Sequence, residues 1–213
     1  MKKYGLIILK ALGVSLAVVF LTLGVFFVLG FFTYQSLKPN LIQASAQVGK
    51  ISSSLQSQDL IAAKEATDKL RLEVATIQNG FNRISFLAKV PFIGSYVSDG
   101  QNVLVAAQAG SDAVDKLIVA IEPYSDLLGF KADAKKLIEV KSIEDRIVFL
   151  VNTLGKISPE LDKISGNLDT AKLALNKINP NRYPENIMGK NIRSRVLDIQ
   201  QSVNDSSNIV SQA

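Results

Sequence analysis

The apolar residues of this chain recur at helical spacing over most of its length. From Leu60 to Ala88 they alternate steps of three and four residues without interruption. The same spacing runs from Val97 to Leu128 and from Ile147 to Ile178, and a shorter run extends from Ile192 to Val210. Such a period gives each helix one apolar stripe that it cannot bury alone. No window alternates apolar and polar residues for long, so we predict no strands.

Helices with one apolar stripe each are expected to pack together as a bundle. Short connections favour antiparallel neighbours, because consecutive helices then bury their stripes against each other. We predict that residues 35–213 form this bundle, with helices at 40–56, 59–88, 95–128, 142–178 and 185–211. The first stripe loses phase near Gln56 and consists of Leu41, Ala44, Val48, Ile51 and Leu55. Packing within one chain and packing as a dimer are both open.

Several residue types mark where these helices begin, bend and end. Asp59 precedes a stripe as a plausible N-cap, whose carboxylate would accept from free backbone N–H groups. Ser142 has the same place before the third long stripe, and Asp145 follows it in the capping-box position. Pro123 should kink or end the second of the long helices, and Pro159 should kink or restart the third.

The beginning of the chain has a different pattern, because it is apolar on every face. No charged residue occurs from Ala11 to Leu37. At about 1.5 Å per residue, the core of this segment is roughly 33 Å long as a helix, enough to cross the ~30 Å hydrocarbon layer. We therefore predict a cytoplasmic N-terminus at residues 1–10 and a transmembrane helix at residues 11–34. The expected fold class is all-α, with one N-terminal transmembrane helix followed by an elongated antiparallel helical bundle or coiled-coil rod.

Two other interpretations of the apolar segment fit less well. A cleaved signal peptide has an apolar region of about 7–15 residues, closely followed by a small-residue cleavage site. Here the candidate site, Ala44 to Ala46, lies well past the apolar end. A soluble core helix is rarely apolar on all faces for this length. Lys2, Lys3 and Lys10 precede the segment and Lys38 follows it, so the rest of the chain should lie outside the cytoplasm.

Composition removes most catalytic chemistry. The 213 residues include no Cys, no His and no Trp. Without cysteine there is no disulfide, thiolate zinc site or cysteine nucleophile, and without histidine the commonest general base near neutral pH is missing. Beyond the N-terminal lysines, basic and acidic residues nearly cancel, so we expect no basic patch for nucleic acid. We predict that the chain is not an enzyme and that it has no catalytic, cofactor-binding or metal-binding residues.

Two features could still carry chemistry. Gly94 and Gly100 suggest a phosphate loop, but Gly100 is followed by Gln101 rather than by Lys and a hydroxyl residue, and no strand precedes the glycines. Carboxylates also recur at helical spacing along one segment, at Asp59, Glu65, Asp68 and Glu73. Acidic residues outside an apolar stripe usually form a solvated helix face.

The stretch KVPFIGSYVSDG, residues 89–100, interrupts the helical period. One stripe stops at Ala88 and the next resumes at Val97, a gap that fits no helical step. Pro91 disfavours helical angles in the residue before it, and Ser95 or Ser98 can cap the next helix. We therefore predict a reversal of the chain here.

This corner is expected at the end of the rod that is distal to the membrane. Phe92, Ile93 and Tyr96 should then cover the end of the bundle core. If Phe92 and Tyr96 were exposed as a pair, a binding surface would be the better interpretation.

The order of these segments resembles a known family. A helix opening Gln58-Asp59-Leu60 with alanines behind it, a Val-Pro-Phe-Ile-Gly corner, a long Ala-rich helix and a proline loop, residues 178–186, follow one N-terminal anchor. This is similar to the N-terminal region of the bacterial domain of unknown function 4012 family, membrane proteins with an extracytoplasmic part. The larger C-terminal signature region of that family is absent up to Ala213. The resemblance implies a stalk or scaffold of an envelope protein and carries over no catalytic residue.

We expect a non-catalytic, single-pass membrane-anchored extracytoplasmic helical stalk, scaffold or protein-interaction module of the bacterial cell envelope. The alternative is a ligand-sensing four-helix bundle of the chemoreceptor or sensor-kinase type that lacks its second membrane helix. Expected partners are the lipid bilayer and either a second copy or an envelope protein. The small-residue pairs Ala11/Ser15 and Gly13/Ala17 could let two membrane helices approach. We expect neither nucleic acid nor a small-molecule ligand.

Overall fold

The computed structural model describes residues 32–125, 130, 143–186 and 191–211. Within these ranges the regular secondary structure is helical and includes no strand, which confirms the predicted all-α class for this part of the chain. The predicted cytoplasmic N-terminus, the predicted membrane helix up to residue 31 and the Ser142 cap lie outside the described residues. Among the helices that are described, none combines the length and the apolar character that a membrane crossing requires.

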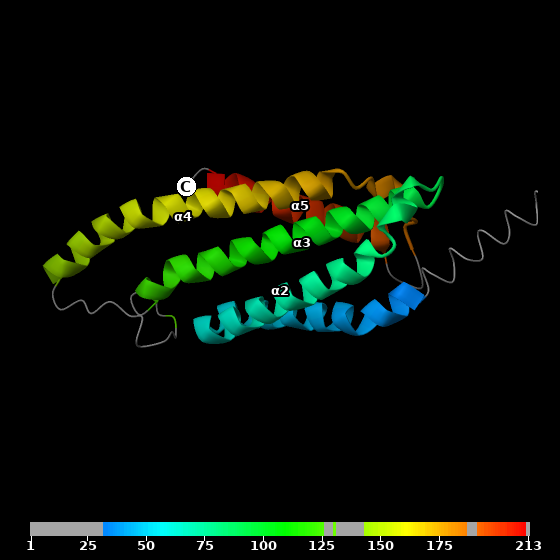
Figure 1. The fold of residues 1–213 in the computed structure, drawn as a ribbon. Coiled ribbons are helices and arrows are strands. Elements are labelled where there is room, and N and C mark those ends of the chain that lie inside the picture. The colour runs from blue at the N-terminus through cyan, green and yellow to red at the C-terminus, as the bar shows by residue number, and fades with distance from the viewer. Residues whose placement is uncertain (1–31, 126–129, 131–142, 187–190, 212–213) are drawn as a thin grey trace, which may run out of the picture.

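Five helices follow one another along the described chain, and consecutive helices run antiparallel along one long axis (Figure 1). The first covers residues 32–56. The others are α2 at Leu60–Asn82, α3 at Gly94–Ile121, α4 at Ile143–Asn176 and α5 at Ile192–Ser211. Short 3₁₀ helices occur at Ser85–Lys89 (η1), Glu122–Tyr124 (η2) and Pro180–Arg182 (η4).

Helix α3 is the central element, because it packs against α2 on one side and α4 on another. One apolar cluster joins the first helix, α2 and α3 through Leu37, Ile77 and Leu104. A second cluster joins α3, α4 and α5, and consists of Ala106, Ala109, Ala171, Ala174, Leu175 and Ile178, with Val196 and Val203 packed against it. The bundle is therefore two three-helix clusters that share α3.

Sharing α3 explains why this helix is buried on two faces. The predicted stripe is confirmed on one face, where Val97, Leu104 and Ile118 are buried. The second face was not predicted and is built from small side chains: Ala106, Ala109, Ala113 and Ala120. Alanine has a short side chain, so it lets α4 approach closely without a large stripe in the sequence pattern.

The predicted N-cap at Asp59 is confirmed. The chain turns at Ser57 and Gln58, where Gln58 has φ of 56°, and then enters α2. The Asp59 carboxylate accepts a 2.9 Å hydrogen bond from the backbone N–H of Ala62. This reversal accounts for the loss of phase near Gln56, because the stripe of the first helix and the stripe of α2 belong to antiparallel helices.

Substituting Asp59→Ala should lower the free energy of unfolding by about 1 kcal/mol, because a free backbone donor of α2 loses its acceptor. Denaturant unfolding of the purified chain, followed by helical circular dichroism, measures this loss. Asp59→Asn is the matched control, since an asparagine oxygen can also cap a helix. Equal losses for the alanine and asparagine variants would contradict a capping role.

The two interior prolines act differently. Helix α3 ends at Ile121 and Pro123 lies in the 3₁₀ helix that follows, so this proline ends the helix. Helix α4 instead continues through Pro159. The predicted serine cap of α3 is wrong: the helix begins at Gly94, and no side chain caps its N-terminus.

The predicted stripe of the first helix is confirmed only in part, at Ile51, which is buried, and at Ala44, which packs against the cluster of Leu37, Ile77 and Leu104. Val48 is exposed, whereas the polar residues Gln47 and Ser54 are buried together with Ile51 and Leu37. The apolar pattern predicted that Val48 is buried, because it counts only apolar residues as candidates for the contact between helices. Contact with α2 decides which face is covered, and that face carries two polar residues.

In the structure the corner that links α2 to α3 comprises residues 83–94, and it lies at the same end of the bundle as the start of the first helix (Figure 1). Thr33 and Tyr34 line the same pocket as Phe81 and Ile84. Phe81 lies shortly before the corner in the sequence, and Ile84 lies within it. The predicted distal placement of the corner is therefore wrong. The first helix leads away from residue 32 and α2 returns, so the next reversal comes back to the end where the bundle starts.

Candidate functional site

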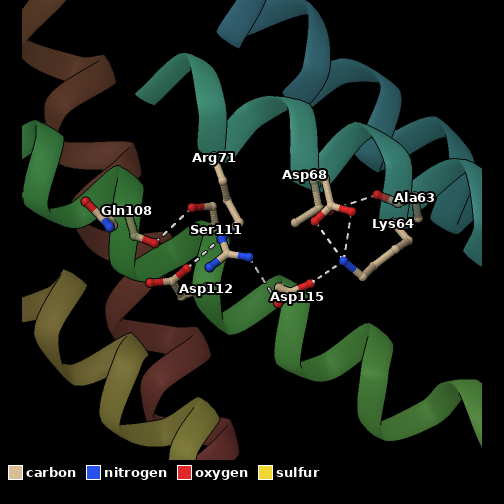
Figure 2. A network of polar contacts seen from close by, with 9 residues as sticks. Ala63, Lys64, Asp68, Arg71, Gln108, Ser111, Asp112 and Asp115 are labelled. Carbon is tan, nitrogen blue, oxygen red and sulfur yellow. Dashed lines mark hydrogen bonds and ion pairs between the residues drawn. The ribbon is translucent and has the colours of Figure 1, made fainter. Parts of the chain in front are cut away.

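Asp68, one of the carboxylates that the sequence singled out, belongs to a network of ion pairs between α2 and α3. Lys64 of α2 contacts Asp68 on its own helix at 2.7 Å and Asp115 of α3 at 2.9 Å. Arg71 of α2 reaches Asp112 of α3 with a 2.8 Å contact from Nε. Figure 2 shows these side chains pointing toward one another across the two helices. The network pins the register of α2 against α3, and each pair is partly exposed to solvent.

The remaining singled-out carboxylates also have structural partners. Glu65 pairs with Lys69 one helical turn away, and this pairing lowers the pKa of the Glu65 carboxyl. Glu73 accepts a 2.8 Å hydrogen bond from the Asn40 amide of the first helix. Because Asp59 caps α2, each of the four carboxylates that the sequence singled out has a structural partner. Within the described residues, no group of acidic side chains is arranged to hold a metal ion.

A buried charge lies at the end of the bundle where residue 32 is located. Asp99, near the start of α3, is 3% exposed. Its Oδ2 atom pairs with the Arg182 guanidinium and accepts a 2.8 Å hydrogen bond from the Tyr183 hydroxyl. Arg182 also donates to the backbone oxygen of Ser95 at 3.4 Å. We call Asp99, Arg182 and Tyr183 the clasp, because they tie α3 to the segment between α4 and α5.

Aromatic contacts and a second arginine extend the clasp. The rings of Tyr96 and Tyr183 meet edge to face, with centroids 5.7 Å apart. Arg193 of α5 donates from Nε to the backbone oxygen of Tyr183 at 3.1 Å and pairs with Glu185 at 2.9 Å. The start of α3 and the proline loop, which are far apart in the sequence, therefore fold against each other.

The clasp makes a definite prediction for alkaline pH. Burial, followed by the hydrogen bond to Asp99, raises the pKa of Tyr183 to about 12, from about 10 in an unfolded chain. Because the folded pKa is the higher one, the stabilisation is fully present below pH about 10 and is lost as the pH rises toward about 12.

This loss should disappear in Tyr183→Phe, which keeps the ring and removes the titrating hydroxyl. Unfolding free energies measured from pH 9 to 11.5 for both chains isolate the effect, because lysines titrate in both. The difference between the two chains should be constant below pH about 10 and should shrink above it. A difference that stays constant over the whole range would contradict the hydrogen-bonded hydroxyl.

An apolar pocket opens at the same end of the bundle. It has a volume of about 290 Å³. Its lining comes from the first helix, α2, the corner and α3, and is Thr33, Tyr34, Leu37, Leu41, Ile77, Phe81, Ile84, Gly100, Val103 and Leu104. Gly100 keeps this site open toward Phe81, because a Cβ there would lie 2.6 Å from the ring. The pocket has the small size and apolar lining of a site for a hydrocarbon group.

Phe92 does not cover the core, which corrects the prediction. Its side chain is 94% exposed, and Tyr96 is 48% exposed. Phe92 also has φ of 65°, in the left-handed region. A non-glycine residue held there costs of order 1–3 kcal/mol, and such strain collects at functional positions. The exposed pair that would indicate a binding surface is therefore present.

Sequence reasoning missed the clasp, although one signal was available. Asp99 lies between Val97 and Gly100, two positions of the predicted stripe, so a charged residue falls close to the buried face. A buried carboxylate needs a cationic or hydrogen-bonding partner. Arg182 could not be identified as that partner, because the pattern gives no distance between residues so far apart in sequence.

No protein-family model, curated protein or solved structure matches this chain. The resemblance to the domain of unknown function 4012 family thus stays a prediction.

Proposed function

We propose that the chain is a single-pass membrane-anchored, extracytoplasmic helical stalk or scaffold of the bacterial cell envelope, without catalytic activity. The observation that carries this proposal is the way the bundle starts. Residues 32–56 are helical, and the uncharged apolar stretch that begins at Ala11 runs directly into this helix. A membrane helix that continues into the first bundle helix would couple the bundle rigidly to its anchor.

The use of polar groups in the bundle supports the non-catalytic part of the proposal. Lys64, Arg71, Asp112 and Asp115 bridge α2 and α3, and the clasp bridges α3 and the α4–α5 segment. These groups pair with each other between helices, which is the arrangement of a structural ion-pair network. An envelope protein or a second copy of the chain is the partner that a scaffold of this kind would hold.

Membrane topology tests the proposal. A reporter that is active outside the cytoplasm and inactive inside it is fused after Ala213. We expect activity, and we expect the chain to resist extraction from membranes at alkaline pH. Replacing Lys2, Lys3 and Lys10 by glutamine is the matched control, because it removes the charge difference that sets the orientation and should lower the active fraction. Reporter activity confined to the cytoplasm would overturn the proposal.

The apolar pocket favours a second candidate function, a ligand-sensing helical bundle. A small apolar molecule held between the first helix, α2 and α3 could shift these helices against each other. A saturable rise in melting temperature on adding such molecules would support this function. Leu41→Trp is the control, since Leu41 lies at the pocket and is 45% exposed, so a larger ring can fill the pocket from its rim. A rise that survives this variant would place the ligand elsewhere.

A further inference from the structure

The corner of residues 83–94 combines exposed aromatic rings with positive charge. Phe86 is 51% exposed and Phe92 is 94% exposed. Arg83 and Lys89 lie in the same segment, and no acidic residue occurs between Glu73 and Asp99. Exposed apolar surface rimmed by polar residues marks places where a protein contacts another protein or a membrane. The composition of the corner therefore fits a surface that contacts an apolar phase bordered by negatively charged groups.

The corner also lies where a membrane would be if the proposed anchor crosses one. The predicted anchor extends to residue 34, and Thr33 and Tyr34 line one pocket together with Ile84 of the corner. Phe32 is 68% exposed and Tyr34 is 54% exposed at this same end. Aromatic residues are enriched at the boundary between lipid and water, where their rings sit at the level of the headgroups.

The conformation of Phe92 agrees with this location. Its left-handed backbone and almost complete exposure are both unfavourable in water, and within the described part of the chain no side chain packs over the ring in compensation. Gly94 fixes the tight backbone next to it, since a Cβ at Gly94 would lie 2.2 Å from the Ala88 oxygen. The corner thus holds Phe92 outward in a defined place. Lys89 and Arg83 have long side chains that can reach anionic headgroups while Phe92 enters the interface.

We propose that residues 83–94 dock on the outer leaflet of the bilayer that anchors the chain, with Phe92 inserted at the level of the headgroups. This inference rests on the proposed function, because it takes the anchor at residues 11–34 as given. It adds a second membrane contact to the anchor. Two contacts at one end would fix the tilt of the bundle relative to the membrane, whereas a single helix would leave the tilt free.

Tryptophan fluorescence tests the contact, because the chain has no tryptophan of its own. The full chain carrying Phe92→Trp is reconstituted into phosphatidylcholine and phosphatidylglycerol vesicles with and without brominated acyl chains, which quench tryptophan at short range. Ile61→Trp is the matched control. Ile61 is apolar and 53% exposed, and it lies near the opposite end of α2, about 30 Å from the corner at 1.5 Å rise per residue.

We expect Phe92→Trp to be quenched at least about twofold more than Ile61→Trp and to emit at shorter wavelength, because interfacial side chains enter by about 5–10 Å. Equal quenching of the two variants, in vesicles that retain the chain, would overturn the docking and leave the anchor standing. If the Phe92→Trp variant were shielded from acrylamide without being quenched by lipid, the docking would also be overturned, in favour of a second copy or another protein on this surface. Release of the chain from vesicles during flotation at alkaline pH would instead show that the anchor itself fails, and the docking with it.

Discussion

Replacing Gly94 by alanine should lower the free energy of unfolding by about 3 kcal/mol, the upper part of the range for forced overpacking. Gly94 is buried at the first position of α3. A Cβ there would lie 2.2 Å from the oxygen and 2.8 Å from the carbonyl carbon of Ala88. Both are backbone atoms, so no side-chain rotation can relieve the clash. The 3₁₀ helix η1 or the start of α3 would have to move.

Thermal unfolding measures this effect. For a chain of this size, a loss of about 3 kcal/mol corresponds to a fall in melting temperature of about 6–12 °C. Gly110→Ala is the matched control in the same helix, because nothing lies within 4 Å of a Cβ at Gly110. There alanine should raise stability by about 0.5–1 kcal/mol, since it restricts the unfolded chain and favours the helix. If the two substitutions had similar effects, the close approach at Gly94 would be refuted.

Replacing Asp99 by alanine should cost about 3 kcal/mol, because two hydrogen bonds to one buried carboxylate are lost. Arg182 and Tyr183 would lose their shared acceptor, and the segment between α4 and α5 would lose its link to α3. The Asp99 side chain is 4% exposed, so water cannot replace it as an acceptor without opening this end of the bundle.

Asp112→Ala is the matched control for this substitution. It removes an aspartate from the same helix that also pairs with an arginine, but the Asp112 and Arg71 side chains are 28% and 43% exposed. A pair that exposed contributes about 0–1 kcal/mol. Denaturant unfolding of both variants compares the two sites. A cost for Asp99→Ala no greater than that for Asp112→Ala would mean that the clasp contributes little to stability.

A double-mutant cycle separates the partners of Asp99. The coupling between Asp99→Ala and Tyr183→Phe should be about 1 kcal/mol or more, since the two groups share a hydrogen bond.

The same substitutions connect stability with the proposed docking surface. The clasp holds the first turn of α3, which follows directly on the corner that presents Phe92, so loosening the clasp should also reduce tryptophan quenching at position 92.

The helices themselves were predictable because the forces that define them act over a few residues. The apolar steps from Leu60 to Ile77 match the buried face of α2, and Asp59 caps that helix as its position predicts. Pro123 ends α3 for an equally local reason, since a proline cannot continue the backbone hydrogen bonding. The sequence also indicates the anchor, which up to residue 31 lies outside the described residues and stays a prediction.

The candidate site was only partly predictable. The corner and the proline loop were each identified as breaks in the helical pattern, and the exposed pair Phe92 and Tyr96 was named as the mark of a binding surface. The contact between the start of α3 and the proline loop was not predicted. Arg182 and Asp99 are 83 positions apart in the sequence, and a periodic pattern carries no information on which helix ends come together.

The sequence by itself determined that this region is helical, where α2 is capped and which residues interrupt the helices, because hydrogen bonds and side-chain packing within a helix reach three or four positions along the chain. The tertiary structure decided the rest. Antiparallel packing brought the corner back to the end where residue 32 lies, contact with α4 buried the alanine face of α3, and the pairing of Asp99 with Arg182 joined α3 to the segment between α4 and α5. Each depends on burying apolar surface between helices distant in sequence, and that choice is made by the whole bundle rather than by any one segment.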